Sequence, residues 1–535
     1  MPPMTGGQAV VATLKQEGVD TLFGINSVHM LPIYDALYDE PSLRLIVPRH
    51  EMAGGFMADA YSRASGKVGV YLTSTGPGAA NSAGAILESW MGSTRTLQLT
   101  GQVDTPYLDQ RRGVLHEAPD QPGMFTALGA RTARVMAPAD APAALHEALC
   151  ALRSQRPRPY VIEMPIDIQY QTADVALGLP LTPALPAPSP ADVERAATLL
   201  LAARRPVVWA GGGINTSGAH AELRRVVEAL GAPVFTTRGG RGALPDDHPL
   251  AVGNYFSEEP GRAFLEAADV VLAVGTRFSG SPTANWSLRL PPGFIRVDID
   301  PAEVDHNYAP TLGIAADARL TLAALAKGLT EERGSVAPDY AAEVSTLRAT
   351  LRAGIRARAP RIAALMDAIT SAMPRETIVV TDATLPAYTG GNQYLPVRAE
   401  RGFVTAHSVA IGAGLPFALG AQAAAPNRPV VCIAGDGGFM LHATELATAV
   451  EAGLPVVVCL FNNGGYGILR RFQRQRFGDR LIGVNLHPPD MIALAGAFGA
   501  RAERVDTPAA LQTAVARAIE RRQVSLIDIQ APFEE

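Results

Sequence analysis

Two short polar motifs in the C-terminal third of the sequence could bind a phosphate together with a divalent cation. GDGG occupies residues 435–438, and NNGG occupies residues 462–465. Glycines let the backbone approach an anion closely, while a carboxylate, an amide and a carbonyl supply the oxygen ligands that Mg²⁺ prefers. We therefore predict a magnesium and phosphate site whose protein ligands are Asp436, Asn463 and the carbonyl of Gly465.

Each motif follows an apolar run that predicts a strand of a parallel sheet. Residues 430–434 and 456–461 are continuously apolar and β-branched, and the segment 442–452 between them has helical spacing. Such a strand–helix–strand unit brings both motifs to the same edge of the sheet, where open α/β sheets bind ligands. Two ordinary Gly/Asn turns are the alternative, but the pairing of the motifs at strand ends favours the phosphate site.

The alternation of strands and helices continues along the chain, so we expect an α/β protein with three doubly wound, open parallel-sheet domains. The predicted domains cover residues 1–175, 191–330 and 361–535, with a proline-rich linker at 172–190 and a charged helical connector at 340–358. Their predicted strands are residues 21–23, 44–47, 68–72, 96–100 and 160–164, then 207–210, 234–236, 270–274 and 296–300, and finally 378–381, 430–434, 456–461 and 525–529.

Glu51 is a further residue placed for chemistry. It lies after the predicted strand 44–47 and before a predicted helix of small residues at 52–64. A carboxylate at a strand end can transfer a proton to or from a ligand in the cleft. On its own, a glutamate at this position is more often a surface residue that begins a helix.

The composition argues against several other classes of function. The chain has 535 residues, 18% of them charged, and a net charge of −5, which gives no electrostatic reason to bind nucleic acid or an anionic membrane. The N-terminal residues lack the regions of a signal peptide, and the weakly polar run 409–425 is broken by two glycines and a proline. The three cysteines share no metal-binding spacing, so we expect a cytoplasmic protein with reduced cysteines.

The motifs resemble those of a known family. GDG, a spacer and NN are similar to the diphosphate and Mg²⁺ motif of thiamine-diphosphate (ThDP) enzymes, and the resemblance runs from Thr5 to Ile529. It is nearest to the acetolactate synthase, 2-oxo acid decarboxylase and benzaldehyde lyase group, and within it to 2-ketoarginine (5-guanidino-2-oxopentanoate) decarboxylases. The resemblance implies a pyrimidine-binding first domain, a central domain similar to an FAD domain, and a diphosphate-binding third domain that shares its fold with the first.

The resemblance also implies roles for individual residues. Glu51, in the matching segment 49–55, would hydrogen-bond the pyrimidine of a ThDP held by another chain. We therefore expect a homodimer or homotetramer with active sites at the dimer interface. Ile411 matches the apolar residue that supports the bent cofactor. The cofactor-binding residues implied in this way are Gly76, Asn81, Ile411, Gly435, Gly437, Gly438, Asn463, Tyr466 and Ile468.

His29 and His116 are additional acid/base candidates. Benzaldehyde lyase and the 2-ketoarginine decarboxylases resemble this chain in having histidine at position 29, where acetolactate synthases have a small residue. His116 lies in a Leu-His-Glu segment where acetolactate synthases have Phe-Gln-Glu. A histidine that titrates near neutrality can pass a proton to a bound intermediate. An ordinary hydrogen-bonded loop histidine is the alternative for His29, and both interpretations stay open.

Departures from acetolactate synthases bear on the reaction. Residues 253–256 replace the Gly-Met-His-Gly loop of their central domain, so FAD is compatible with this domain but is not expected. RFSGS at 277–281 replaces their RFDDR, which leaves Ser281 where the second arginine holds the acceptor 2-oxo acid. The chain ends at Glu535, so we expect their C-terminal lid to be missing. The basic segment 470–480 is expected to be a solvated helix face, with a substrate carboxylate or subunit contact as the alternative.

The expected activity is that of a ThDP- and Mg²⁺-dependent decarboxylase or carboligase, which acts on a 2-oxo acid through an enamine and can use an aldehyde acceptor. Acetolactate synthase and a benzaldehyde-lyase-like acyloin lyase are the alternative enzymes. A ThDP-fold protein that only binds a nucleotide or a partner is the non-catalytic alternative, and the presence of Glu51, Asp436 and Asn463 argues against it. A nicotinamide oxidoreductase is disfavoured because the glycines at 211–213 lack the G-x-G-x-x-G spacing.

Overall fold

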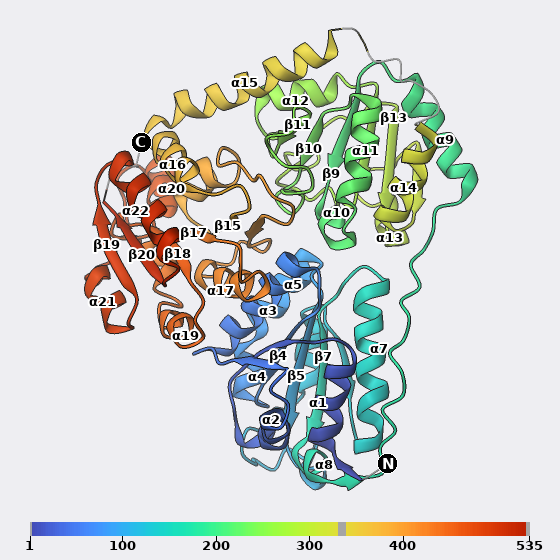
Figure 1. The fold of residues 1–535 in the computed structure, drawn as a ribbon, viewed down its shortest axis with the longest axis vertical. Helices are drawn as coiled ribbons and strands as arrows, with labels where there is room; N and C mark the ends of the chain where they lie inside the picture. The colour runs from blue at the N-terminus through green and yellow to red at the C-terminus, as the bar shows by residue number, and fades with distance from the viewer. Residues whose placement is uncertain (1–2, 330–336, 338, 531–535) are drawn as a thin grey trace.

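Three α/β domains follow one another along the chain in the computed structural model, which describes residues 3–329, 337 and 339–530. In Figure 1 the first domain is blue, the central domain is green and the third is orange to red. The ends of the predicted domains at residues 1, 330 and 535 lie outside the described residues. Within the described part of the chain, no helix combines the length and the apolar composition needed to cross a bilayer.

The first domain is built on a six-stranded parallel sheet with the strand order β3-β2-β4-β5-β7-β6. Helices cover both faces of the sheet, so the central strand β4 is buried along its whole length. A capping box between Thr5 and Gln8 begins helix α1, and strand β1 pairs antiparallel with β8. The elements are β1 (Met4–Thr5), α1 (Gly6–Gln16), β2 (Thr21–Gly24), α2 (Leu31–Tyr38), β3 (Arg44–Ile46), α3 (Glu51–Ser65), β4 (Gly69–Thr73), α4 (Pro77–Asn81), α5 (Ala83–Gly92), β5 (Thr96–Gln102), α6 (Gln121–Ala127), β6 (Arg131–Arg134), α7 (Ala141–Ser154), β7 (Tyr160–Pro165), α8 (Ile166–Tyr170) and β8 (Thr172–Ala173).

The central domain has the strand order β11-β10-β9-β12-β13-β14, again all parallel. Counted within the domain, this is the order 3-2-1-4-5-6 of dinucleotide-binding sheets. The elements are α9 (Pro190–Ala202), β9 (Pro206–Ala210), α10 (Gly212–Ser217), α11 (His220–Leu230), β10 (Val234–Thr236), β11 (Ala251–Gly253), α12 (Glu259–Glu266), β12 (Val270–Val274), β13 (Gly293–Asp298), α13 (Pro301–Val304), β14 (Leu312–Ala315) and α14 (Ala318–Leu329), and the connecting helix is α15 (Tyr340–Arg358).

The third domain repeats the topology of the first. Its order β16-β15-β17-β18-β20-β19 and the order of the first domain both become 2-1-3-4-6-5 when the six strands of each sheet are counted along the chain. The shared fold that the resemblance implied is therefore present. The elements are α16 (Pro360–Ala372), β15 (Ile378–Thr381), β16 (Phe403–Thr405), α17 (Gly414–Ala424), β17 (Val430–Gly435), α18 (Asp436–Phe439), α19 (Glu445–Glu451), β18 (Val456–Phe461), α20 (Gly467–Phe477), α21 (Met491–Ala497), β19 (Arg501–Val505), α22 (Pro508–Arg521) and β20 (Ser525–Ile529).

Every predicted strand is present, with ends shifted by at most three residues. The strands that the sequence patterns missed in the three large sheets all lie at sheet edges: β6, β11, β14, β16 and β19. Edge strands pair on one side only and can stay polar, as in Arg131–Arg134 and Arg501–Val505, so they lack the apolar runs that identify central strands.

The helix predicted at 442–452 is present as α19, but it begins three residues later than predicted, at Glu445. Residues 440–444 form turns between α19 and the short helix α18, which begins at Asp436. His442 lies in these turns. Its Nδ1 is hydrogen-bonded to the carbonyl oxygen of Gly412, with 3.0 Å between the two atoms. This tertiary contact fixes a bend that helical spacing alone does not predict.

Helix α3 packs against helix α17 and fastens the first domain to the third. The rings of Phe56 and Phe417 meet edge to face, with 5.3 Å between their centroids. Gly420 allows the helices to approach closely, because a Cβ there would collide with the carbonyl oxygen of Met57. Side chains of both domains consequently form one continuous apolar core. The weakly polar run 409–425 forms a turn, in which Val409 and Ile411 are exposed, followed by the buried helix α17.

A cluster of buried charged side chains holds the C-terminal end of helix α3. Arg63 contacts Asp59 and Glu88 at 2.7 Å each, and it donates to the carbonyl of Thr405 in the third domain. Glu88 accepts the backbone N–H of His407 at 2.7 Å. Burial, together with the charge of Arg63, lowers the pKa of His407 to about 3, so its ring stays neutral at physiological pH. The two domains thus share a compensated charge network.

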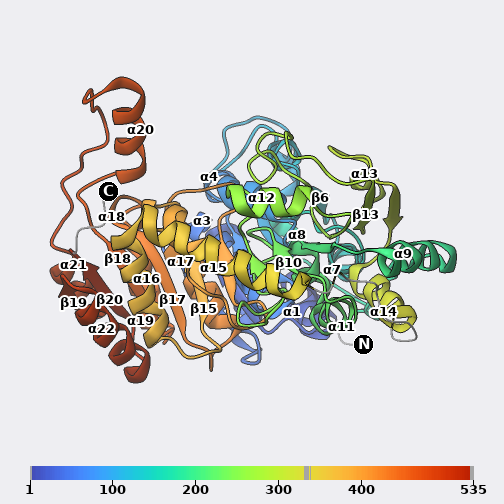
Figure 2. The same ribbon diagram turned by 90° about the horizontal axis from the view of Figure 1, so that it is seen from above.

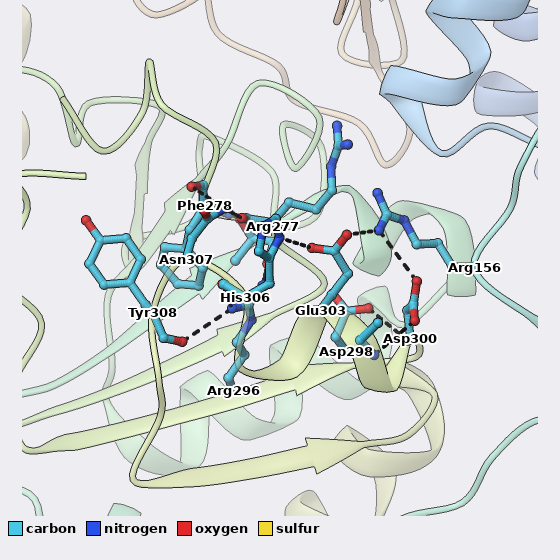
Figure 3. Close-up of polar contacts among 12 residues, drawn as sticks. Arg156, Arg277, Phe278, Arg296, Asp298, Asp300, Glu303, His306, Asn307 and Tyr308 are labelled. Atoms are coloured by element: carbon cyan, nitrogen blue, oxygen red, sulfur yellow. Dashed lines mark hydrogen bonds and ion pairs between the residues drawn. The ribbon is translucent and has the colours of Figure 1, made fainter. Parts of the chain in front are cut away.

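The first and central domains are joined by the ion pair of Arg156 with Glu303 (Figure 3). The guanidinium of Arg156 also lies 3.6 Å from a carboxylate oxygen of Asp300. Arg277 of the central domain donates to the carbonyl of Met91 at the end of helix α5. Polar contacts therefore fix this boundary, whereas the contact of the first domain with the third is largely apolar.

Replacing Glu88 by glutamine should destabilise the junction between the first and third domains, because Arg63 would lose one of its two buried carboxylate partners. We expect a loss of about 3 kcal/mol, which corresponds to a thermal midpoint roughly 5–10 °C lower. Glu343→Gln, which removes a partly exposed ion pair with Arg205, is the control and should shift the midpoint by less than about 2 °C. Equal midpoints for the two variants in calorimetry would contradict the role of the cluster.

Candidate active site

A cavity of about 850 Å³ lies between the central and third domains, and first-domain residues such as Ser93, Arg95 and Arg156 also line it. The predicted diphosphate-binding residues line it at the carboxyl ends of strands β17 and β18, where the topology leads a ligand to bind. Helix α20, which stands out from the third domain in Figure 2, forms part of the wall near the NNGG turn. The predicted residues among the lining are Ile411, Gly435, Gly437, Gly438, Asn463, Gly465, Tyr466 and Ile468.

The GDGG turn is packed closely against other residues of the cavity wall. A Cβ at Gly435 would lie 2.5 Å from the Thr384 hydroxyl, and one at Gly437 would lie 2.7 Å from the ring of Tyr466. Glycine is therefore required for the turn to pack, and three of its glycines line the cavity. A backbone cradle of this kind fits a phosphate group.

Asp436 joins the two motifs. Its carboxylate oxygens accept the N–H of Gly465 at 2.8 Å and the N–H of Asn463 at 3.4 Å. The side chain is 1% exposed, and burial raises the pKa of its carboxyl group. The described residues contain no group of three His, Cys, Asp or Glu side chains that could bind a metal. One carboxylate with an amide and a carbonyl nevertheless fits Mg²⁺, since this ion usually completes its octahedron with phosphate oxygens and water.

The prediction of a solvated helix face at 470–480 is wrong for Arg470. This side chain is 9% exposed, and its guanidinium reaches Asn485 Oδ1 at 3.0 Å and the Gly464 carbonyl at 3.3 Å. The N–H of Tyr466 also donates to Val484. A charged side chain thus braces the loop that carries the predicted metal ligands, while the remaining arginines of the segment are exposed.

Asp382 is a residue of this site to which the sequence patterns gave no role. It follows strand β15 and is 3% exposed, and its Oδ1 accepts the N–H groups of Ala383 and Gly412 at 2.7 and 2.9 Å. Burial raises the pKa of this carboxyl group to about 6. Because Gly412 follows Ile411, Asp382 holds the loop that presents the isoleucine, which is 38% exposed in the cavity wall.

The first-domain candidates form a second group. Glu51 is the first residue of helix α3, and its Oε2 accepts a hydrogen bond from the Asn81 side chain at 3.1 Å. Gly76 precedes helix α4, which carries Asn81. The turn at Gly76 passes directly under the carbonyl of His116, where a Cβ would collide. Four of the five first-domain candidates thus lie around one end of the sheet.

His29 joins this group through its ring. The centroids of the His29 and His116 rings are 5.1 Å apart, and the Ser74 hydroxyl lies 3.2 Å from His116 Nδ1. His29 is 6% exposed, and burial together with the nearby His116 lowers its pKa. Its Nδ1 has no hydrogen-bond partner within the residues that the structure describes.

Within one chain, the first-domain candidates do not line the cavity that the third-domain candidates line. Of the described residues that line the cavity, none is Gly76, Asn81, Glu51, His29 or His116. The cavity instead extends from the GDGG turn into the central domain, where Gly213, Arg277 and Asp298 line it together with Ser281. Figure 3 shows this central-domain side, with Arg277 and Asp298 near the ion pair of Arg156 and Glu303.

Comparison with known proteins places this geometry in a family. The thiamine pyrophosphate enzyme N-terminal TPP binding domain matches residues 4–124, the central domain matches residues 193–325, and the C-terminal TPP binding domain matches residues 387–529. These three regions fall on the three parallel sheets.

Full-length relatives agree with the domain matches. The chain is 39% identical to the probable 2-ketoarginine decarboxylase AruI of Pseudomonas aeruginosa, over 93% of this chain and 88% of that protein. It is 30% identical to the probable acetolactate synthase large subunit of Methanococcus aeolicus, over 98% and 92%. It is also 30% identical to the acetolactate synthase isozyme 2 large subunit of Escherichia coli, over 94% and 91%. The chain therefore belongs to the family of thiamine pyrophosphate enzymes.

Proposed function

We propose that this protein is a ThDP- and Mg²⁺-dependent decarboxylase or carboligase of 2-oxo acids. The observation that carries the proposal is the joining of the GDGG and NNGG turns by the Asp436 carboxylate. When bound there, ThDP supplies an acidic ring carbon that adds to a ketone and accepts electrons as CO₂ leaves. The chain itself has to hold the diphosphate, orient the cofactor and move protons.

Each half of the site has a separate task in this proposal. Asp436, Asn463 and the Gly465 carbonyl would hold Mg²⁺, and Ile411 would give the cofactor an apolar support. The Glu51 carboxylate, positioned by Asn81, would exchange a proton with the pyrimidine ring. His29 and His116 would deliver or remove the proton at the substrate-derived carbon, since their rings are adjacent to each other.

We further propose that the active unit is a homodimer, in which the first domain of one chain completes the site on the third domain of its partner. The separation of the two groups within one chain supports this arrangement. Exposed apolar side chains beside both groups support it as well, because such patches are typical of protein interfaces. They are Val28, Leu31 and Leu115 near the histidines, and Val409, Leu469 and Phe472 at the cavity.

Decarboxylation with release or transfer of an aldehyde unit is the reaction that we favour. The relatives bear the names of a 2-ketoarginine decarboxylase and of acetolactate synthases, so the donor that we propose is a 2-oxo acid. Acetolactate synthesis is the second candidate. It is disfavoured by Ser281, which lines the cavity at the position of the acceptor-binding arginine. We do not expect a requirement for FAD, because residues 253–256 replace the Gly-Met-His-Gly loop that acetolactate synthases have in this domain.

Asp436→Ala should abolish Mg²⁺-dependent ThDP binding, because it removes the charged ligand and frees the N–H of Gly465. Titration calorimetry with and without Mg²⁺ measures the effect. Asp479→Ala, at a side chain that is 93% exposed, is the control and should bind normally. Unchanged ThDP affinity in Asp436→Ala would place the metal site elsewhere.

Glu51→Gln should fold and bind ThDP but lose most of its activity, since an amide cannot cycle a proton with the pyrimidine. We expect turnover at least about 100-fold below that of the parent enzyme. Glu520→Gln, on the exposed side of helix α22, is the control. CO₂ release from a panel that includes pyruvate and 5-guanidino-2-oxopentanoate provides the assay. Turnover within about threefold of the parent would exclude this role for Glu51.

With pyruvate alone, released aldehyde or acyloin should exceed acetolactate. Condensing two 2-oxo acids requires a second carboxylate to be held, for which a guanidinium offers two parallel hydrogen bonds and Ser281 at most one. The expected deficit is about 1.5–3 kcal/mol, or roughly ten- to a hundredfold in rate. Quantification of both products checks this. If acetolactate were the dominant product, another cation would have to hold the second carboxylate. The exposed Arg471 would then be the first residue to replace by mutation.

A further inference from the structure

Glu445 is a buried carboxyl group outside the cavity lining that connects the third domain to the segment before Glu51. It begins helix α19 and is 0% exposed. Its Oε1 accepts the backbone N–H of Arg49 at 2.9 Å, and the N–H of His50 also bonds to this carboxylate. A buried carboxylate is tolerated only when hydrogen bonds replace its lost hydration, and here two of the donors are backbone groups of another domain.

Helix α19 holds this segment at further points. The Thr448 hydroxyl lies 2.7 Å from Glu445 Oε2 and 3.3 Å from the carbonyl oxygen of Val47. The guanidinium of Arg49 pairs with Glu451 at the end of the same helix. The segment from Val47 to His50, which joins strand β3 to helix α3, is therefore held by the third domain as well as by the His50 side chain, which accepts the N–H of Met52 within its own domain.

The same part of the third domain reaches the diphosphate side of the site. His442 lies three residues before Glu445, and its Nδ1 is hydrogen-bonded to the carbonyl oxygen of Gly412. Its ring packs against the ring of His50, with 5.8 Å between the centroids. Gly412 is in turn held by Asp382. The segment before Glu51 and the loop of Ile411 are thus attached to one short stretch between α18 and α19.

We propose that Glu445 is a positioning residue for Glu51. By fixing the N–H groups of Arg49 and His50, it sets the direction in which helix α3 begins and therefore where the Glu51 carboxylate lies. This inference rests on the proposed proton-transfer role of Glu51. Burial raises the pKa of Glu445 while the backbone N–H groups that it accepts oppose the shift, so the carboxylate form is the one that these donors stabilise.

The test compares Glu445→Gln with Glu451→Gln. The first variant keeps the shape of the side chain but replaces one acceptor oxygen by an NH₂ donor and removes the charge that strengthens the hydrogen bonds from the backbone N–H groups. The second removes only the partner of the Arg49 guanidinium, at a side chain that is 61% exposed. Hydrogen exchange of peptides covering residues 44–52, in protein without added ThDP, reports the backbone directly. We expect exchange at least about tenfold faster in Glu445→Gln and unchanged in the control.

A second measurement tests the consequence for Glu51. Exchange of the acidic ring proton of bound ThDP with D₂O should slow by about 10- to 100-fold in Glu445→Gln, while ThDP affinity changes by less than about threefold. Thr448→Val, which removes the hydroxyl that supports Glu445, should shift both readouts in the same direction by a smaller factor. This variant carries the test if Glu445→Gln does not fold.

The outcomes separate the two proposals. If Glu51→Gln slows ring-proton exchange but Glu445→Gln and Thr448→Val do not, the positioning role is overturned and the proposed function stands. Unchanged backbone exchange at residues 44–52 in both Glu445→Gln and Thr448→Val also overturns the positioning role. If Glu51→Gln itself leaves ring-proton exchange unchanged, the proposed role of Glu51 fails first.

Discussion

The packing of helix α3 against helix α17 is the contact on which the rest of the site depends. It is close because Gly420 lets the two backbones approach, and it merges the apolar cores of the first and third domains. Helix α3 is also held at both ends by the third domain, through Glu445 at its start and through Arg63 near its end. The position of helix α3, which carries Glu51, is therefore fixed in part by a domain other than its own.

Three charged side chains with little exposure near the candidate site are compensated by ion pairs or hydrogen bonds. Arg63 lies between two carboxylates, Glu445 is surrounded by N–H and hydroxyl donors, and Asp436 accepts two backbone N–H groups. Leaving any of these groups without its partners would cost several kcal/mol. Each pairing therefore couples a local conformation to a tertiary contact, and these conformations are the turns and helix ends that carry the predicted ligands.

The three sheets place their ligand-binding turns by topology. The first and third domains share one strand order, and the central domain has the order of dinucleotide-binding sheets. One cavity connects the GDGG turn of the third domain with the glycine turn of the central domain, so a ligand in one part borders the other. Ser281, to which the proposed preference for aldehyde over acetolactate is assigned, lies in this shared wall.

The sequence alone determined the strands that are buried on both faces and the turns that end them, because apolar runs and glycine or asparagine turns are local signals. These signals correctly predicted that GDGG and NNGG meet at one sheet edge, and the family resemblance identified Glu51 and Ile411 as candidates. The tertiary structure decided which polar side chains are buried. Arg470 is predicted to be solvated but braces the loop that carries the predicted metal ligands Asn463 and Gly465. Asp382 and Glu445 had no predicted role. Their partners are distant in sequence, or come close only because of a bend such as that at His442. The spacing of apolar residues along the chain therefore does not reveal these contacts. The separation of Glu51 from the cavity follows from the docking of whole domains, which only long-range packing specifies.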